Sequence, residues 1–192
     1  MTLLDARENQ PLQGGASFSL RHRVFRAIWG VAWALFASWT PAPLHRWRVL
    51  LLCLAGAKVH ASAHVYGSAR IWYPPHLHMG PHSCLGPQVN CYNMAPIRLG
   101  QKTIVSQGAH LCAGTHNIDD PNHQLVVKPI TIGDSVWVAA EAFIGPGINI
   151  GNNAVIGARC VLFKDAETSG VYAGNPARLI RQRNNLSESK HS

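Results

Sequence analysis

The sequence predicts an all-β solenoid, because three observations indicate a chain that winds as a prism of short strands. Aliphatic residues recur every six positions, without a break from Ile132 to Leu162. A small or apolar residue stands four positions after nearly every one of them, and glycine often follows directly. A period of six fits neither the helical repeat nor a simple alternating strand. It is typical of a solenoid with one short strand per hexapeptide.

The repeat comprises fifteen hexapeptides, which group as five coils of three. The leading residues are Val59, Val65, Ile71, Met79, Leu85, Cys91, Leu99, Val105, Leu111, Ile132, Val138, Ile144, Ile150, Ile156 and Leu162. The glycines that directly follow a leading residue are Gly80, Gly86, Gly100, Gly133, Gly145, Gly151 and Gly157. We expect these glycines to supply the positive φ that a corner of the prism needs. Successive coils should stack about 4.8 Å apart, so that equivalent positions form columns.

The register is interrupted in three places, and each interruption follows the third hexapeptide of a coil. The spacing rises from six to eight residues twice, and to twenty-one residues between Leu111 and Ile132. Every insertion therefore leaves the prism at the same corner. We expect the functional site at the longest insertion, residues 117–131, because long loops on a rigid scaffold commonly carry function.

The segment before the repeat predicts two short helices. Residues 1–19 are polar, and we expect them to be poorly ordered. Two apolar, Trp-rich runs follow on either side of residues 40–43, and neither reaches the roughly 20 residues that span a bilayer. We interpret the helices as a cap over the first coil. The alternative is an Arg-flanked amphipathic pair, within residues 20–56, that lies in an anionic membrane interface.

Length and composition indicate one domain with appendages. The 192 residues carry a formal charge of +8, which suggests an anionic partner such as a nucleotide, a phosphate or a membrane surface. The five cysteines are odd in number and include no CxxC, which favours reduced thiols in a cytoplasmic protein. The predicted divisions are a tail and helical cap over 1–58, the solenoid over 59–167, and a basic C-terminal tail over 168–192.

One histidine of the eleven has a special position. His116 ends the third hexapeptide of the third coil, directly before the long insertion, and an imidazole is suited to move a proton near neutral pH. We therefore predict that His116 is a general base. Cys112 is a conceivable nucleophile, although a small inert residue is the more usual role at its position. Asp119, Asp120 and Glu141 are candidates to orient the imidazole.

Four segments carry a resemblance to a known family. They are GTHNIDDP at 114–121, KPITIGDSVW at 128–137, AAEAF at 139–143 and VYAGNPAR at 171–178. With the Trp-rich N-terminus, they resemble the hexapeptide-repeat O-acetyltransferases of the galactoside, maltose and nodulation-factor superfamily. The colanic acid and exopolysaccharide biosynthesis acetyltransferases are the most similar branch. The resemblance covers roughly residues 18–183.

This resemblance implies a left-handed parallel β-helix that forms a homotrimer, with acetyl-CoA bound in clefts between neighbouring subunits and no metal. The implied reaction is direct acetyl transfer from acetyl-CoA to a sugar hydroxyl, in a surface or exopolysaccharide precursor. His116 matches the catalytic base of the family. Asn93 matches an acceptor-side asparagine, although the residues that follow it, Met94 to Pro96, depart from the sugar-acetylating relatives.

The resemblance also assigns residues to the cofactor. Trp137 matches the aromatic residue that packs near the cofactor arm and the histidine. Ala140 and Ala158 match positions whose backbone meets the pantetheine chain. Lys164 and Arg178 match basic groups near the phosphates of CoA. Arg181 and Arg183 are weaker candidates for the same role.

Three other interpretations stay open. A zinc-dependent, carbonic-anhydrase-like lyase can use the same fold, but the HxxxxH pair of that family is missing here. A non-catalytic binding solenoid would not need the sharp interruption of the third coil. The acceptor can also be an antibiotic, an amino sugar or a lipid-linked sugar; the last would suit peripheral contact of residues 20–56 with the inner membrane. We expect no nucleic-acid partner.

Overall fold

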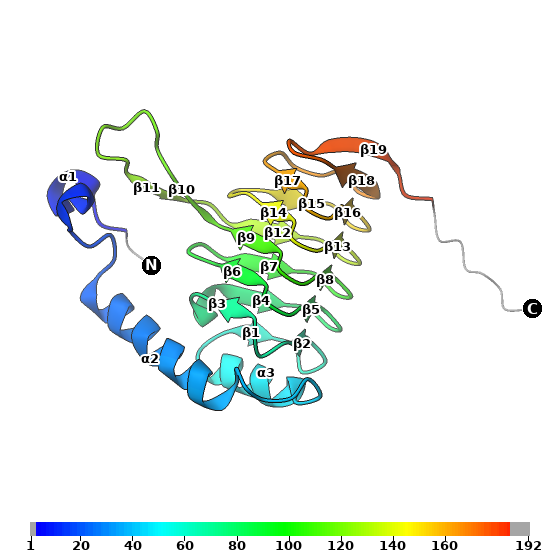
Figure 1. Cartoon of the computed structure of the whole chain (residues 1–192), viewed down its shortest axis with the longest axis horizontal. Coiled ribbons are helices and arrows are strands. Elements are labelled where there is room, and N and C mark those ends of the chain that lie inside the picture. Colours follow the sequence, from blue (N-terminus) through cyan, green and yellow to red (C-terminus); the bar gives the residue numbers. More distant parts are fainter. Residues whose placement is uncertain (1–2, 185–192) are drawn as a thin grey trace, which may run out of the picture.

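The computed structural model describes residues 3–184, and these residues form a parallel β-solenoid with three faces (Figure 1). The first face holds β1 (Lys58–Val59), β4 (Leu77–Met79), β7 (Ile97–Leu99), β12 (Ile130–Ile132) and β15 (Asn149–Ile150). The second face holds β2 (His64–Val65), β5 (Cys84–Leu85), β8 (Ile104–Val105), β13 (Trp137–Val138), β16 (Val155–Ile156) and β18 (Gly170–Ala173). The third face holds β3 (Arg70–Ile71), β6 (Asn90–Tyr92), β9 (His110–Cys112), β14 (Phe143–Ile144) and β17 (Val161–Leu162). Consecutive strands lie on successive faces, as the hexapeptide register predicts.

The solenoid continues beyond the five predicted coils into a partial sixth. Ala166 forms a parallel bridge with Ile150 on the first face, and β18 extends the second face beyond β16. A further strand, β19 (Arg178–Gln182), returns antiparallel to β18. The count of five was therefore one partial coil short, because the aliphatic register ends before the backbone pairing does. Much of the segment expected as a basic tail closes the C-terminal end of the solenoid, while residues 185–192 lie outside the described part.

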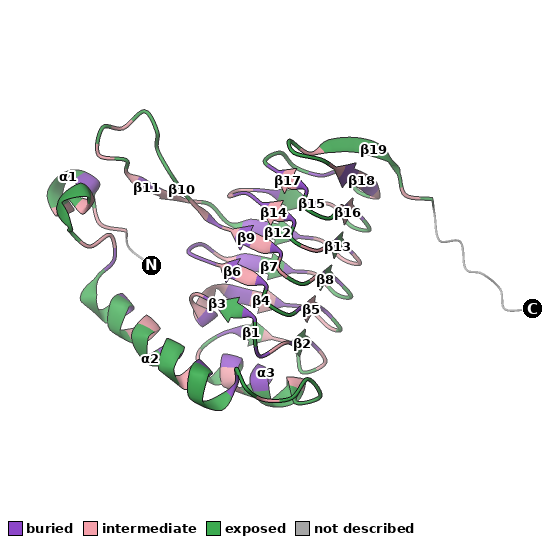
Figure 2. Ribbon diagram, viewed as in Figure 1, coloured by how far each residue is buried: buried purple, intermediate pink, exposed green. Residues whose placement is uncertain are grey.

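The leading residues of the hexapeptides form the core, which runs up the inside of the prism (Figure 2). All of them are buried except Val59, which is partly buried at the capped end. The small residues four positions later, such as Ala63, Ala109 and Ala154, are fully buried beside them. Backbone hydrogen bonds join each coil to the next, as in Gly86 N–H to the Val105 carbonyl at 2.8 Å. The repeat is therefore both the core pattern and the register of strand pairing.

The glycines after the leading residues serve a different purpose from the one we expected. Positive φ occurs three positions after the leading residue, and mostly not at glycine: His82 has φ 55° and Glu141 has φ 58°. None of the seven glycines has a positive φ. A Cβ at Gly80 would instead lie 2.8 Å from the Gln101 backbone nitrogen of the next coil. These glycines permit the close approach of stacked coils, so the expected role at the corners was wrong.

Two helices cover the N-terminal end of the solenoid. Helix α3 (His45–Leu54) packs against β1 and β2, and it buries Arg48, Val49 and Leu52. Helix α2 (Leu20–Phe36) begins at Ser19, whose hydroxyl accepts a hydrogen bond from the His22 N–H at 3.4 Å. Two indole N–H groups fasten α2 to the solenoid: that of Trp29 donates to the Ile71 carbonyl at 2.8 Å, and that of Trp33 to the Gly67 carbonyl at 3.0 Å. A short 3-10 helix, η2 (Pro74–His76), fills the insertion between the first two coils.

Residues 3–18 have a defined structure, contrary to our expectation. Residues 3–18 form α1 (Ala6–Asn9), the 3-10 helix η1 (Pro11–Gln13) and a bridge between Leu3 and Phe18. Gln124, in the long insertion, accepts a hydrogen bond from the Ala6 N–H and donates one to the Leu4 carbonyl at 3.2 Å. We call residues 3–18 the N-terminal arm. Among residues 3–184, no helix has both the length and the apolar character needed to cross a membrane.

Candidate active site

The long insertion forms a β-hairpin that projects from the solenoid. Its strands are β10 (Gly114–His116) and β11 (Leu125–Val127), which pair antiparallel with His116 opposite Leu125. The hairpin leaves the prism after β9 and returns at β12, so it stands at the corner between the third and first faces. Figure 1 shows it extending toward the N-terminal arm. The arm and the hairpin, which are distant in sequence, thus lie side by side.

A backbone carbonyl orients the imidazole of His116. Its Nδ1 lies 2.6 Å from the carbonyl oxygen of His123, across the hairpin loop. Because a carbonyl only accepts hydrogen bonds, Nδ1 carries the proton and Nε2 carries the lone pair. His116 is exposed, so this Nε2 is accessible to a small molecule. The geometry is that of a base with a defined tautomer.

Two of the carboxylates that we considered as orienting groups for His116, and the candidate nucleophile Cys112, are engaged elsewhere. Asp120 accepts a hydrogen bond from the Asn122 N–H at 2.8 Å, within the loop of the hairpin. Glu141 forms an ion pair with Arg159 at 2.7 Å. The thiol of Cys112 donates to the Gly114 carbonyl at 3.2 Å. Among the described residues, none of these three side chains forms a hydrogen bond with the His116 imidazole.

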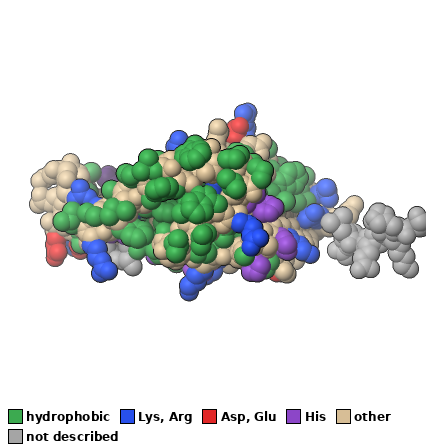
Figure 3. All heavy atoms as spheres, turned by 90° about the horizontal axis from the view of Figure 1, so that it is seen from below, with side chains coloured by type: hydrophobic (Ala, Val, Ile, Leu, Met, Phe, Trp, Pro, Cys, Tyr) green, Lys and Arg blue, Asp and Glu red, His purple; other side chains and the backbone are tan. Residues whose placement is uncertain are grey.

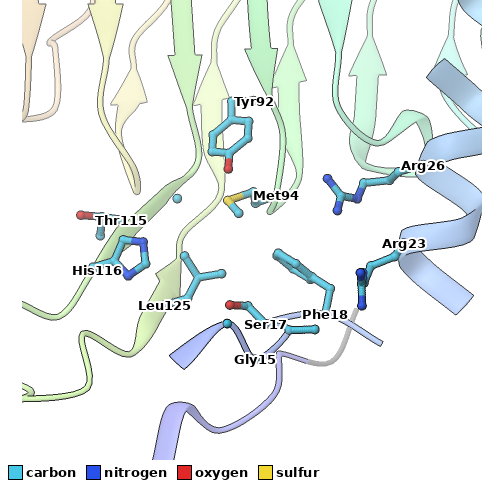
Figure 4. A pocket seen from close by; sticks show the side chains of 13 residues that line it. Gly15, Ser17, Phe18, Arg23, Arg26, Tyr92, Met94, Thr115, His116 and Leu125 are labelled. Carbon is cyan, nitrogen blue, oxygen red and sulfur yellow. The ribbon is translucent and has the colours of Figure 1, made fainter. Parts of the chain in front are cut away.

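His116 borders a pocket of about 460 Å³, between the hairpin, the third face and the N-terminal arm (Figure 4). The lining residues are Gly14, Gly15, Ala16, Ser17, Phe18, Arg23, Arg26, Tyr92, Met94, Gly114, Thr115, His116 and Leu125. This volume lies in the range of pockets that bind small ligands. The sequence indicated His116 but missed the opposite wall, where α2 presents Arg23 and Arg26. The basic start of α2 was visible in the sequence, but nothing local indicated that it reaches the hairpin.

The side chain of Asn93, which we matched to an acceptor-side asparagine, does not line this pocket. It is fully buried, its amide donates to the Tyr73 carbonyl at 2.8 Å, and its side-chain oxygen accepts from the Tyr73 N–H at 2.9 Å. Both polar atoms are therefore engaged by the backbone of the preceding coil. Met94, the next residue, lines the pocket instead.

Comparisons with known proteins agree with this architecture. The family described as bacterial transferase hexapeptide (six repeats) matches residues 129–164. WcaF of Escherichia coli (strain K12), named as a putative colanic acid biosynthesis acetyltransferase, is 38% identical over 156 residues, which cover 81% of this chain and 86% of WcaF. The chain belongs to the hexapeptide-repeat acetyltransferases. It is thus an acyltransferase by family, as the resemblance predicted.

Two solved structures show the same fold. A maltose O-acetyltransferase from Clostridium difficile 630 superposes with a TM-score of 0.77 and 25% sequence identity. The match covers 86% of this chain and 90% of the maltose O-acetyltransferase chain. The hexapeptide-repeat acetyltransferase VCA0836 of Vibrio cholerae O1 biovar eltor, complexed with acetyl coenzyme A, superposes with a TM-score of 0.77 and 22% sequence identity. This match covers 89% of this chain and 93% of the VCA0836 chain. The predicted left-handed parallel β-helix is confirmed.

The residues matched to the cofactor fall into two groups on opposite sides of the prism. Trp137 lies exposed on the second face, where its indole N–H donates to the Ser106 hydroxyl at 2.9 Å. Ala140 follows Trp137 on the same coil, and Ala158 has the equivalent place on the next coil. The two coils are joined there by a hydrogen bond from the Arg159 N–H to the Ala140 carbonyl at 2.9 Å. Arg178 and Arg181 lie exposed on β19, beside the same face.

The second group lies at the corner that carries the hairpin. Lys164 follows β17 at this corner, two coils beyond His116, and it is exposed. In a three-faced prism this corner, between the third and first faces, is opposite the second face. A single acetyltransferase subunit therefore does not bring Trp137 and His116 together. Two subunits side by side can do so.

The zinc alternative is not favoured. The relatives are acetyltransferases. Among residues 3–184, moreover, no group of three or more His, Cys, Asp or Glu side chains is arranged to hold a metal ion. The five cysteines are free thiols, and Cys91 and Cys160 are buried at inward positions of the register.

Proposed function

We propose that this protein transfers the acetyl group of acetyl-CoA to a sugar hydroxyl in a surface polysaccharide or exopolysaccharide precursor, with His116 as the general base. The observation that carries the proposal is the His116 imidazole, fixed by the His123 carbonyl with Nε2 available beside a pocket of suitable size. The name of the Escherichia coli relative supports a polysaccharide acceptor. The acetyl coenzyme A complex of the Vibrio cholerae protein supports acetyl-CoA as the donor.

The proton movements follow from the tautomer. Nε2 of His116 accepts the proton of the acceptor hydroxyl while the hydroxyl oxygen attacks the carbonyl carbon of the thioester. The carbon–sulfur bond then breaks, and the imidazolium returns its proton to the departing thiolate. The Nδ1–H bond to the His123 carbonyl persists throughout and stabilises the imidazolium. No covalent intermediate with the enzyme is required.

We propose a homotrimer in which each active site lies between two subunits. One subunit supplies His116 and the other supplies Trp137, Ala140 and Ala158, since one prism carries these residues on opposite sides. The phosphates of CoA require cations, and Lys164, Arg178 and Arg181 are exposed and available for that role. Mixing inactive His116→Ala and Trp137→Ala subunits under exchange conditions should restore part of the activity. A monomeric active enzyme would contradict the shared site.

The catalytic role is tested by replacing His116. His116→Ala should lower the turnover number for acetyl transfer by about 10² to 10⁴, the usual contribution of a general base, and leave the melting temperature unchanged. His123→Ala is the matched control, because it keeps the backbone carbonyl that orients the imidazole. Product is identified by mass after incubation with acetyl-CoA and a panel of sugar, antibiotic and amino-sugar acceptors. Undiminished turnover of His116→Ala would exclude His116 as the base.

We further propose that the helical cap contacts an anionic membrane surface. Large apolar side chains lie exposed on α2, α3 and the turn between them, and they cover much of the end of the molecule seen in Figure 3. They are Leu20, Val24, Ile28, Val31, Leu35, Phe36, Trp39, Leu44, Trp47, Leu50 and Leu54. The sequence has no Asp or Glu between Glu8 and Asp119. An apolar face without carboxylates and with arginines beside it complements an anionic lipid surface.

Sedimentation with vesicles tests this contact. The protein should bind phosphatidylcholine vesicles that contain phosphatidylglycerol and bind poorly to phosphatidylcholine alone. Ile28→Glu combined with Leu50→Glu should weaken binding about tenfold or more. Ile180→Glu, at the opposite end of the solenoid, is the control, since Ile180 is 62% exposed and Ile28 is 65% exposed. If the double variant instead changes the number of subunits, the face is an interface between copies of the chain.

A further inference from the structure

The guanidinium of Arg26 is held at the wall of the pocket without an anionic partner among the described residues. It lies 4.2 Å from the ring centroid of Trp72 and 5.5 Å from that of Phe18. Figure 4 shows Arg26 and Arg23 extending from α2 toward the space that His116 borders from the other side. The two aromatic rings hold the planar group in place by cation–π contacts. This wall therefore carries a positive charge whose position is set by two aromatic rings.

The donors of Arg26 are not used within the described part of the chain. Its Nε is buried and has no hydrogen-bond partner, and its terminal nitrogens form no hydrogen bond with any residue of 3–184. Burial lowers the pKa of Arg26, Tyr92 in the same pocket acts in the opposite direction, and Arg23 adds a smaller lowering. Across residues 3–184 the single ion pair is that of Arg159 with Glu141, far along the solenoid. Arg26 is partly buried beside a second, exposed arginine and has no carboxylate partner within residues 3–184, so a bound anion would offset its desolvation.

Arg48, on the next helix, shows what a purely structural arginine looks like in this protein. It is fully buried, and every donor nitrogen is used. Its Nε donates to the Val65 carbonyl at 2.6 Å, and its two terminal nitrogens donate to the Thr40 hydroxyl at 2.7 Å and the Ala42 carbonyl at 2.6 Å. Arg26 has no comparable set of carbonyls, and it faces a cavity instead.

We infer that Arg23 and Arg26 bind an anionic group of the acceptor, a carboxylate or a phosphate, and thereby place a hydroxyl of the same molecule at Nε2 of His116. The inference rests on the proposed function, which supplies the acceptor and the base. A guanidinium binds either oxyanion through paired N–H groups. The acceptor class is then an acidic sugar, either a uronic acid or a sugar phosphate, and not a neutral sugar.

Matched acceptors distinguish these classes. The acceptors are methyl glucoside, which is neutral, methyl glucuronoside, which has a carboxylate, and glucose 1-phosphate. The wild-type enzyme should acetylate one or both acidic sugars with a kcat/KM about 10- to 100-fold above that of the neutral sugar. Arg26→Gln and Arg23→Gln should remove this preference, because they lower kcat/KM for the acidic sugars much more than for the neutral sugar. Preference for the glucuronoside would identify the carboxylate, and preference for glucose 1-phosphate the phosphate.

Arg21→Gln is the matched control, because Arg21 is an exposed arginine of the same helix that does not line the pocket. It should keep the preference. Arg26→Lys, which keeps the charge but not the planar donors, should retain part of it. An equal loss for neutral and acidic sugars in Arg26→Gln would overturn the inference and indicate a structural role.

Binding without turnover separates this inference from the proposed function. Calorimetry with His116→Ala should show that glucose 1-phosphate or methyl glucuronoside binds more tightly than methyl glucoside, and that added salt weakens only the acidic sugars. If Arg26→Gln abolishes that difference while no acceptor is acetylated by the wild type, the anion site stands and the proposed reaction fails. Equal binding of acidic and neutral sugars would overturn the anion site whatever the activity.

Discussion

Arg48 and Arg26 lie on adjacent helices of the same cap, and neither has a carboxylate partner among the described residues. Arg48 is surrounded by backbone carbonyls, which accept from all of its nitrogens and join the turn at Thr40 to β2. Arg26 is stacked on aromatic rings at the edge of a cavity, with a buried Nε that has no partner within residues 3–184. Carbonyl dipoles in a closed environment make one arginine structural. The open side of the pocket leaves the other available to a ligand.

The comparison extends to the regions around them. The cap around Arg48 is closed on the solenoid, because Leu52 of α3 and Val65 of β2 are fully buried between them. The region around Arg26 is assembled from the N-terminal arm, α2, the third face and the hairpin, with a cavity at its centre. We therefore expect substitutions in the first region to affect stability, and substitutions in the second to affect the acceptor.

The largest expected effect on stability is that of Arg48→Met. The apolar side chain has a similar length, but it leaves several buried carbonyls without a donor, which should cost about 3 kcal/mol of the free energy of unfolding. Arg46→Met, an exposed position of the same helix, should cost less than about 0.5 kcal/mol. Urea unfolding followed by circular dichroism measures both. Equal free energies of unfolding for Arg48→Met and the wild type would contradict the structural role of Arg48.

A smaller effect is expected where the arm meets the hairpin. Gln124→Ala removes the two hydrogen bonds that join the hairpin to Ala6 and Leu4. Each such bond contributes about 1 kcal/mol. Because the arm forms one wall of the pocket, the KM for the acceptor should rise several-fold, while the melting temperature should fall less than it does for Arg48→Met. Asn122→Ala, elsewhere in the hairpin loop, is the control; a fall in melting temperature without a change in KM would contradict this prediction.

The smallest effect is a dependence of stability on pH. Burial lowers the pKa of His22, with a further contribution from Arg26; it also lowers the pKa of His45, which lies beside Arg48. Below pH about 6.5 the unfolded chain therefore binds more protons than the folded chain. Stability should be fully present above that pH and should decline as the pH falls toward the folded-state pKa values. Melting temperatures between pH 8 and 5 measure the decline.

The control for this pH dependence is a pair of substitutions. His22→Phe keeps the aromatic contacts with Phe18 and Tyr73, which have ring centroids at 5.0 and 4.6 Å, and it should flatten the curve. His60→Gln, at an exposed position, should leave the curve unchanged. A curve that rises toward low pH in the wild type would show that the predicted sign is wrong.

Much of the solenoid could be predicted because its information is local and repeated. Every leading residue except Val59, for example Leu85 or Ile144, is buried at the position that the six-residue count gives it. The details that the sequence did not reveal depend on neighbours distant in sequence. The role of Gly80 depends on the backbone of the next coil, and the buried amide of Asn93 depends on the backbone of Tyr73.

The site divides in the same way. The sequence placed His116 directly before the long insertion, since the register places every insertion at one corner of the prism. It did not reveal the orienting group, because a backbone carbonyl, that of His123, has no signature in side-chain types. It also missed Arg23 and Arg26, whose pocket exists only where the arm packs on the hairpin.

The sequence by itself therefore determined the solenoid, the corner from which the long insertion leaves it, and the proposed base of this acetyltransferase. The reason is that a six-residue period specifies a strand, a core position and a corner at every repeat. Only the tertiary structure decided the pocket. Its walls are joined by contacts such as that between Ala6 and Gln124, which are 118 residues apart. No periodic pattern encodes such a contact, because it occurs once in the chain, between the arm and the insertion.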